Sequence, residues 1–359
     1  MNSRERTFLA LEHKTGDRIP MDFWATAAVA RRLEAELGVS YKGFLDRYDV
    51  DLRYIEGPAY VGPPLAGGTD IWGVTRSTVP PGAGGGECYS EVTQAPLGIA
   101  ESVEEVLAYG HWPDADLFDY SSIEAQCDAV RREERVVVFM GDRLNRVAQL
   151  KPAMYLRGTE NILVDLAIRQ DIARTIFLKI RGFYLTYLER ILAAANGKID
   201  IVLTGDDFGT QHGLLIGIDM WRRFIRPGFT AYVDLIRSQD VIAMHHTCGS
   251  VSELIPDMID CRLDVLQSIQ PEAAGMSLVE LKKRCGDRIC FQGGISIQKT
   301  MPYGSPEDVR REVRAIAETV KPDGGYIFGT SHNIQADTPT KNIIALVEAY
   351  HDYGNCGET

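Results

Sequence analysis

The sequence predicts an α/β protein in which parallel strands close into one eight-stranded barrel. Eight short apolar or β-branched runs alternate with long amphipathic segments, a rhythm typical of a parallel sheet. Several runs are almost continuously apolar, as strands buried on both faces are. A doubly wound sheet is the alternative, but no G-x-G-x-x-G follows the first run. The 359 residues therefore predict a single (β/α)8 TIM barrel, residues 1–359, rather than two domains.

The eight expected strands are spread over the whole chain, at residues 19–24, 51–57, 135–141, 199–207, 240–248, 264–270, 288–295 and 325–332. Helix start signals lie between them. Ser250 with Glu253 and Ser277 with Glu280 match the capping box. Ser305 precedes a first-turn proline, and the helix that follows has an apolar stripe at Val309, Val313, Ile316 and Val320.

Residues 57–100 interrupt this rhythm, because they are rich in Gly and Pro and contain only short β-like pieces. We interpret them as an insertion after the second strand. Two forms of it stay open. It is a hairpin and lid over the barrel mouth, or it is a mobile surface loop.

Composition narrows the function classes. The formal net charge is −12, which disfavours nucleic acid and acidic membranes as partners, because phosphates need a basic patch. No apolar run approaches the roughly 20 residues that span a bilayer, and the N-terminal segment shows no signal peptide. Seven cysteines are thinly spread without C-x-x-C, so we expect a cytoplasmic protein with free thiols.

The expected strand ends are unusually polar. In a barrel of this kind the active site lies at the carboxyl ends of the strands. Those ends offer Asp22 and Trp24, Glu56, Asp142 and Arg143, Asp206 and Asp207, His246 and Cys248, Gln270 and Glu272, Gln292, and Ser331 and His332. We expect half of these residues only to cap the strand ends in loops. Capping alone does not explain several carboxylates, two histidines and a thiol at one end of the barrel.

The sharpest pair is His246 and Cys248. Alternate residues of a strand point to the same side, so H-x-C can present an imidazole and a thiolate to one metal ion. Zn²⁺ takes both ligand types, and His332 at the end of the last strand completes three protein ligands. The alternative is a cysteine packed as a small hydrophobe beside a histidine bonded to a neighbouring loop. We expect His245 to face away and pack.

A second cluster, Asp206 and Asp207, follows the apolar run IVLT between two glycines. We expect one of the two to face the mouth as an acid, a base or a ligand orienter. An Asx-type turn is the alternative. Glu56 is a further candidate catalytic carboxylate. Candidates for substrate binding are Trp24, Tyr155, Arg157, Gln211, Gln292 and Tyr326.

Long motifs in the same order resemble the uroporphyrinogen decarboxylase superfamily. They are GDDFGTQHG from Gly205, HHTCGSVSELIPDMID from His245, IQPEAAGM from Ile269, FQGGI from Phe291 and SHNIQADTP from Ser331. The similarity covers nearly the whole chain. It implies a (β/α)8 barrel with a cleft at its mouth.

Two chemistries exist in this superfamily. Its decarboxylases need no metal and grip the substrate carboxylates with arginines of an N-terminal motif. This chain has Phe23, Trp24 and Ala25 where those arginines are expected, and a polycarboxylate without partners would be costly to desolvate. His332 does match the decarboxylase pattern, so decarboxylation of a tetrapyrrole stays the alternative function.

The sequence is more similar to the cobalamin-dependent methyltransferase branch, which is methylcobalamin:coenzyme M methyltransferase-like. His246 and Cys248 match its H-x-C zinc ligands, but Ser331 and His332 stand where a third cysteine is expected. This resemblance implies Zn²⁺ as a Lewis acid and an acid such as Asp206 or Asp207 that protonates a leaving group. The substrate is then a small methyl ether, amine or thiol.

The same resemblance implies partners. The chain shows no D-x-H-x-x-G signature, so the corrinoid, as methylcobalamin, would arrive on a separate small protein. A homodimer is common in the superfamily. A barrel that only binds a ligand, without catalysis, is the third interpretation.

Overall fold

The structure, a computed structural model, describes residues 1–79, 89–141 and 146–357. Asp142 and Arg143, which were expected at a strand end, lie outside these residues. The strands are β1 (Leu52–Ile55), β2 (Ala59–Tyr60), β3 (Thr75–Val79), β4 (Tyr89–Gln94), β5 (Phe118–Asp119), β6 (Val136–Phe139), β7 (Ile201–Gly205), β8 (Ile242–His246), β9 (Val265–Ile269), β10 (Cys290–Gly293) and β11 (Tyr326–Ile327).

The helices lie between these strands and at both ends of the chain. They are α1 (Ser3–Leu11), α2 (Ala27–Leu37), α3 (Tyr41–Arg47), α4 (Val103–Leu107), α5 (Ile123–Arg132), α6 (Leu150–Arg157), α7 (Thr159–Ile168), α8 (Gln170–Ala194), α9 (Ile218–Met220), α10 (Arg226–Arg237), α11 (Ile255–Asp260), α12 (Leu278–Cys285), α13 (Thr300–Tyr303), α14 (Pro306–Val320) and α15 (Thr340–Tyr353). A short 3₁₀ turn, η1 (Ala115–Leu117), and a π-helical turn, η2 (Trp221–Ile225), complete the set within the described residues.

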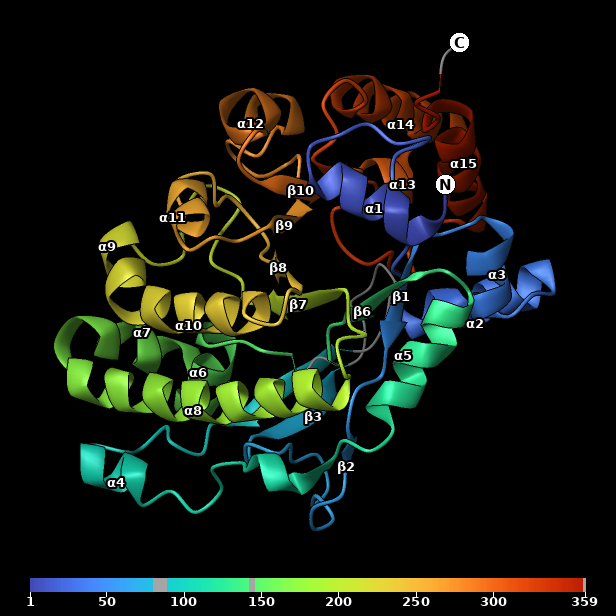
Figure 1. The fold of residues 1–359 in the computed structure, drawn as a ribbon. Coiled ribbons are helices and arrows are strands. Elements are labelled where there is room, and N and C mark those ends of the chain that lie inside the picture. Colours follow the sequence, from blue (N-terminus) through green and yellow to red (C-terminus); the bar gives the residue numbers. More distant parts are fainter. Residues whose placement is uncertain (80–88, 142–145, 358–359) are drawn as a thin grey trace.

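A curled parallel sheet forms the centre of the molecule, and helices surround it (Figure 1). In the described residues it has seven strands in the order β1-β6-β7-β8-β9-β10-β11, so each strand pairs with its sequence neighbours within the sheet. Every pairing is parallel, and His246 of β8 stands opposite Gln267 of β9. The predicted α/β class with a parallel sheet is confirmed.

The first expected strand, residues 19–24, is not a regular strand. Met21 forms an isolated parallel bridge with Phe328, just after β11. The amide of Asp22 donates to Phe328 O at 2.8 Å, and the amide of Asp51, just before β1, donates to Met21 O at 2.9 Å. The segment thus joins the two edges of the sheet, but Pro20 has no N–H to extend the ladder.

Helix signals were right where the side chain could reach the backbone. Ser305 and Asp308 form a capping box at α14, and the predicted apolar stripe of that helix is buried. The box expected at Ser250 is wrong, because α11 begins five residues later and Ser250 Oγ donates to Ala274 O at 2.6 Å. Ser277 takes the N-cap position of α12 without a side-chain cap bond.

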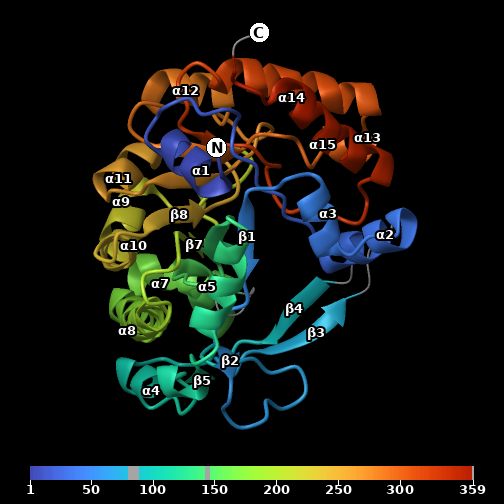
Figure 2. The same ribbon diagram turned by 45° about the vertical axis from the view of Figure 1, so that its right-hand side comes forward.

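The segment expected as an insertion holds an antiparallel pair, in which β3 runs beside β4 with Arg76 opposite Val92. Figure 2 shows this pair standing apart from the central strands. The segment after β4 contacts α6, because the amide of Leu97 donates a hydrogen bond to Leu156 O at 2.8 Å. The residues between β3 and β4 lie outside the described part of the chain.

The inside of the curled sheet is filled by a small apolar cluster from alternate positions of the strands. It comprises Leu52, Val136, Val138, Ile201, Leu203, Met244, Val265, Cys290 and Ile327. A larger core packs the helices against the outer faces of the strands. The filled interior leaves the carboxyl ends of the strands as the place for a site. Across the described residues, no helix combines the length and apolarity that crossing a bilayer requires.

Candidate metal centre

A cavity of about 700 Å³ opens at the carboxyl ends of the strands. Met140 follows β6, and Gly205 and His246 are the last residues of β7 and β8; all three line the cavity. Its walls include the aromatic rings of Trp24, Trp72, Tyr155 and Tyr184. A cavity with aromatic walls therefore lies at the end of the strands where the sequence predicts the site.

Two loops meet backbone to backbone beside this cavity, one after β7 and one after β8. A Cβ on Gly209 would lie 2.7 Å from Ser250 N, and one on Gly249 would lie 2.5 Å from the Gly209 carbonyl carbon. Gly249 also has φ +84°, which L side chains rarely adopt. The two glycines thus permit the close approach that brings Asp207 to the amide of Cys248, at 3.1 Å.

His246 is buried and its ring orientation is fixed. Its Nδ1 lies 2.9 Å from Gln267 Oε1, an amide oxygen that can only accept. Nδ1 therefore carries the proton, and Nε2 keeps a free lone pair facing Cys248 Sγ at 3.4 Å. Burial, with His332 nearby, holds the pKa of His246 below its usual value, so the ring is neutral.

His332 joins the pair from the far side of the mouth. One ligand atom from each of His246, Cys248 and His332 lies within 4.8 Å of the others; we name these three residues the ligand cluster. Trp24 packs against both imidazoles, with ring centroids 6.1 Å from His246 and 5.4 Å from His332. Burial raises the pKa of Cys248 to about 12 and lowers the pKa of His332.

The ligand cluster fits a zinc ion. Tetrahedral Zn²⁺ with Zn–N near 2.0–2.1 Å and Zn–S near 2.3 Å places N and S ligands roughly 3.5 Å apart. The observed separation between His246 Nε2 and Cys248 Sγ is 3.4 Å. The neighbouring Ser331, where a cysteine was expected by resemblance, is buried and its amide donates to Ile295 O at 2.8 Å.

Asp206 caps a helix instead of facing the mouth. Its carboxylate accepts from the amides of Gln149, Leu150 and Lys151 at 2.6, 2.9 and 2.7 Å, at the first turn of α6. Burial raises the pKa of Asp206 to about 6 in spite of these three donors. The carboxylate is fully engaged, so an acid role in catalysis is not supported for Asp206.

Asp207 is the member of the pair that reaches the ligand cluster. Its Oδ2 lies 2.6 Å from Lys151 Nζ, and its Oδ1 lies 3.9 Å from His246 Nε2. Burial alone would raise the pKa of Asp207, but the Lys151 ammonium and the Cys248 amide outweigh it and hold the pKa well below its usual range. A carboxylate in this state orients its neighbours and is a poor proton donor.

The remaining predicted residues divide into two groups. Trp24 and Tyr155 line the cavity. Glu56 and Gln211 are exposed and do not line it. Arg157 is buried against Asp165, with Nε to Oδ2 at 2.7 Å, and also donates to Leu97 O. It therefore anchors the end of the segment 57–100 to α6.

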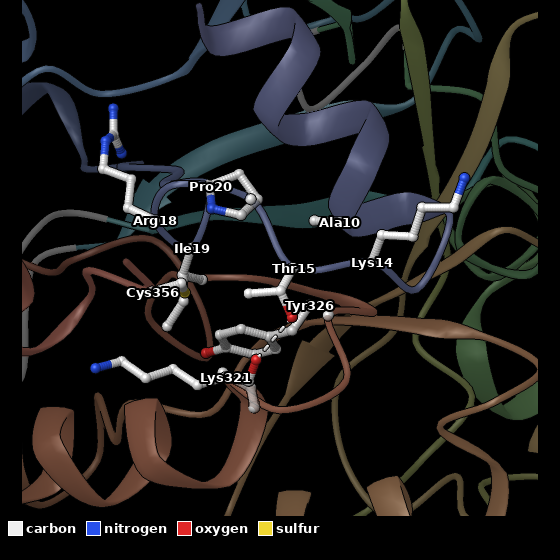
Figure 3. Close-up of a pocket in the computed structure, with 12 residues that line it drawn as sticks. Ala10, Lys14, Thr15, Arg18, Ile19, Pro20, Lys321, Tyr326 and Cys356 are labelled. Carbon is white, nitrogen blue, oxygen red and sulfur yellow. Dashed lines mark hydrogen bonds between the residues drawn. The ribbon is translucent and has the colours of Figure 1, made fainter. Parts of the chain in front are cut away.

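Tyr326 lies in a different, much smaller pocket at the opposite end of the strands. Figure 3 shows its ring there beside Thr15 and Cys356. Its hydroxyl donates to Gly293 O. The pocket measures about 10 Å³, room for a single water at most. Tyr326 is a core residue of the barrel.

Gln292 lies below the cavity in a buried polar group. Its Nε2 donates to Asp22 Oδ2 at 3.2 Å, and the hydroxyl of Tyr54 donates to the same oxygen at 2.7 Å. Burial raises the pKa of Asp22 to about 6. This group supports the floor of the site and does not line the cavity.

The sequence interpretation missed the cations of the cavity wall. Arg76, Arg146 and Lys151 all line it, and Asp70 is the acid beside Arg76. Lys151 could have been found, since it precedes the predicted Tyr155 by one helical turn. Arg76 and Asp70 lie in the insertion, where no periodic pattern indicates which side chains face inward.

His245 packs as expected, stacked on Phe208 at 5.3 Å and edge-on to Phe229 at 4.9 Å. The described cysteines are free thiols, and Cys127, Cys261, Cys285 and Cys290 are buried. Among the described cysteines, only Cys248 belongs to the ligand cluster.

Two kinds of known protein are similar to parts of this sequence. Methylcobamide:CoM methyltransferase MtaA from Methanosarcina barkeri is 28% identical over 170 residues, 46% of either chain. A uroporphyrinogen decarboxylase from Psychromonas ingrahamii is 32% identical over 77 residues, 21% of either chain. The chain thus spans less than half of the length of these curated relatives.

A solved structure, a methyltransferase from Methanosarcina mazei, shares the fold with a TM-score of 0.71 at 17% identity, covering 98% of this chain and 99% of its own. The family model for uroporphyrinogen decarboxylase (URO-D) matches residues 147–353, more than half of the 359 residues and the part that holds the whole ligand cluster. The chain belongs to the uroporphyrinogen decarboxylase (URO-D) family.

Proposed function

We propose that this protein is a zinc-dependent methyltransferase that moves a methyl group between a small substrate and a corrinoid carried by a partner protein. The observation that carries the proposal is the ligand cluster at the floor of the cavity. The similarity to a methylcobamide:CoM methyltransferase supports it. The barrel is a complete (β/α)8 barrel in this proposal, with residues 20–25 in place of the first strand.

His246, Cys248 and His332 would hold the ion. When bound, Zn²⁺ supplies Lewis-acid chemistry, activating a thiol or a methyl–heteroatom bond of the substrate. Gln267 keeps His246 in the tautomer that leaves Nε2 available. Asp207 holds the Cys248 loop through its amide, and Lys151 balances the charge of Asp207.

The cavity walls would exclude water from the transferred group. The open side of the cavity is where a corrinoid protein would dock, since the methyl group has to reach it from outside. The protein would act in the cytoplasm, and a homodimer is the expected assembly. Decarboxylation of a polycarboxylate gains no specific support, because it needs cations for several carboxylates and Lys151, one of the described cations of the wall, already pairs with Asp207.

The test compares purified wild type with Cys248→Ala, and uses Cys356→Ala as the matched control because Cys356 is a half-buried thiol outside the ligand cluster. We expect stoichiometric zinc in wild type and control, and its loss in Cys248→Ala. We expect wild type and control to demethylate methylcobalamin, a reaction that the absorbance of methylcobalamin monitors. This activity should be lost together with the zinc. A metal-free wild type that decarboxylates uroporphyrinogen would refute the proposal.

A further inference from the structure

The outer wall of the cavity carries an arginine from the insertion. Arg76 of β3 lines the cavity, and its side chain is 8% exposed. Its Nε donates to Asp70 Oδ2 at 3.3 Å. Asp70 Oδ1 in turn accepts from the amides of Trp72 and Val74 at 2.9 and 3.1 Å. The loop therefore folds around one carboxylate, which positions the guanidinium.

This guanidinium is not satisfied by the protein. Its Nη2 is buried and has no hydrogen-bond partner among the residues that the structure describes. The guanidinium carbon lies 4.2 Å from the centroid of the Tyr155 ring, a cation–π contact that supplies no hydrogen-bond acceptor to Nη2. A buried donor without an acceptor is costly, and the guanidinium fork matches a planar oxyanion with two oxygens. An anionic ligand would supply the missing acceptor.

A chain of contacts along α6 also links Arg76 to the ligand cluster. Lys151 and Tyr155 both line the cavity and lie about one turn apart on α6, about 6 Å along its axis. Lys151 is bound to Asp207, which touches the cluster, whereas Arg76 stacks 4.2 Å from the Tyr155 ring. Arg76 and the ligand cluster thus face one cavity, beside neighbouring turns of α6.

Part of the cavity wall is apolar and rich in aromatic rings. It is formed by aromatic rings and by two further apolar side chains, namely Trp24, Trp72, Tyr155, Tyr184, Met140 and Pro152. Aromatic walls favour an aromatic ligand, which stacks face-to-edge or offset on such rings. The other wall cations are already in contact with the protein, because Lys151 pairs with Asp207 and Arg146 donates to Met140 Sδ at 2.9 Å.

We propose that the substrate is a small aromatic monoanion, with its carboxylate or sulfonate on Arg76 and its methyl-bearing group at the ligand cluster. The orientation toward the cluster rests on the proposed methyltransferase function. The anion site itself does not, because it follows from the Arg76 contacts.

The test measures binding by calorimetry without a corrinoid present, so that it does not depend on methyl transfer. The probes are 4-methoxybenzoate, 4-methoxybenzenesulfonate, anisole as the neutral analogue, and coenzyme M (2-mercaptoethanesulfonate) as an aliphatic anion. The proteins are wild type, Arg76→Gln, and Arg314→Gln, a surface arginine of α14 paired with Glu318. We expect Arg76→Gln to lose roughly 10- to 100-fold in affinity for the aromatic anions and to keep its affinity for anisole.

Arg314→Gln should bind every probe as wild type does. Whichever of the two aromatic anions binds with higher affinity would show whether Arg76 prefers a carboxylate or a sulfonate. Equal losses for anisole and the anions in Arg76→Gln would overturn the proposal, because they would mean a damaged pocket wall. Tighter binding of coenzyme M than of both aromatic anions would overturn it as well. A protein that binds the aromatic anions but transfers no methyl group would refute the proposed function and leave the anion site standing.

Discussion

At the scale of single residues, the proposed metal site depends on the neighbouring atoms that orient its three candidate ligands. Two adjacent aspartates have different tasks: Asp206 binds the first turn of α6, and Asp207 reaches the ligand cluster. Sequence spacing placed His246, Cys248 and His332 together, and the structure brings them within 4.8 Å. Spacing could not separate the two aspartates, because their roles depend on where α6 begins relative to β7.

Gln267 offers a prediction at this scale. Replacing it with leucine removes the acceptor of His246 Nδ1–H, and both side chains have a similar volume. We expect zinc affinity to fall roughly 10- to 100-fold, as for other residues that orient metal ligands. Competition with a chelator of known affinity measures it.

Gln292→Leu is the matched control, because it is a buried amide on the neighbouring strand that bonds Asp22. It should bind zinc as wild type does. Gln267→Glu, which keeps an acceptor oxygen, should restore most of the affinity. If Gln267→Leu and Gln292→Leu lost the same affinity, the orienting role would be wrong.

At the scale of elements, the fold places the site by bringing two glycine-containing loops together after β7 and β8. The strands of the sheet could be predicted because their apolar runs are continuous and their burial is uniform. The first expected strand could not be judged from residues alone, since residues 19–24 make only isolated bridges to their neighbours. The cavity wall formed by residues 57–100 could not be predicted either. Arg76 and Asp70 form an ion pair there, in a segment whose sequence has no periodic pattern.

Gly209→Ala tests the contact between the loops. The added methyl would lie 2.7–2.9 Å from the backbone of residues 248–250, which cannot move aside as a side chain would. We expect a loss of about 1–3 kcal/mol in the free energy of unfolding, and weaker zinc binding because the Cys248 loop is displaced. Denaturant unfolding and zinc titration measure the two effects.

Gly213→Ala in the same loop is the control, because nothing lies within 4 Å of its added Cβ. It should change the free energy of unfolding by no more than about 0.5 kcal/mol. Equal stability of the two variants would show that the loops do not depend on the close approach.

At the scale of the whole molecule, a buried carboxyl group couples stability to pH. Asp22 lies with Tyr54 and Gln292 in the polar group below the cavity. Burial raises the pKa of Asp22 to about 6, with Tyr54 and Gln292 as neutral donors and Arg53 as the nearby cation. The folded protein holds this proton more tightly than the unfolded chain, whose aspartate titrates near 3.9. Stability therefore falls as the pH rises from about 4 to 6 and levels off above that.

We expect Asp22→Asn to lack this part of the pH dependence. Relative to the variant, wild type should lose about 2 kcal/mol in the free energy of unfolding between pH 4 and 7. Urea unfolding at a series of pH values measures the difference. Parallel curves for the two proteins would contradict a raised pKa at Asp22.

The central claim, that the ligand cluster is a zinc site, is tested most directly by zinc K-edge X-ray absorption of the zinc-loaded protein. The account predicts one Zn–S distance near 2.3 Å and the remaining ligands as N or O near 2.0–2.1 Å, of which two are imidazoles. A spectrum without a sulfur ligand, or with two, would contradict it.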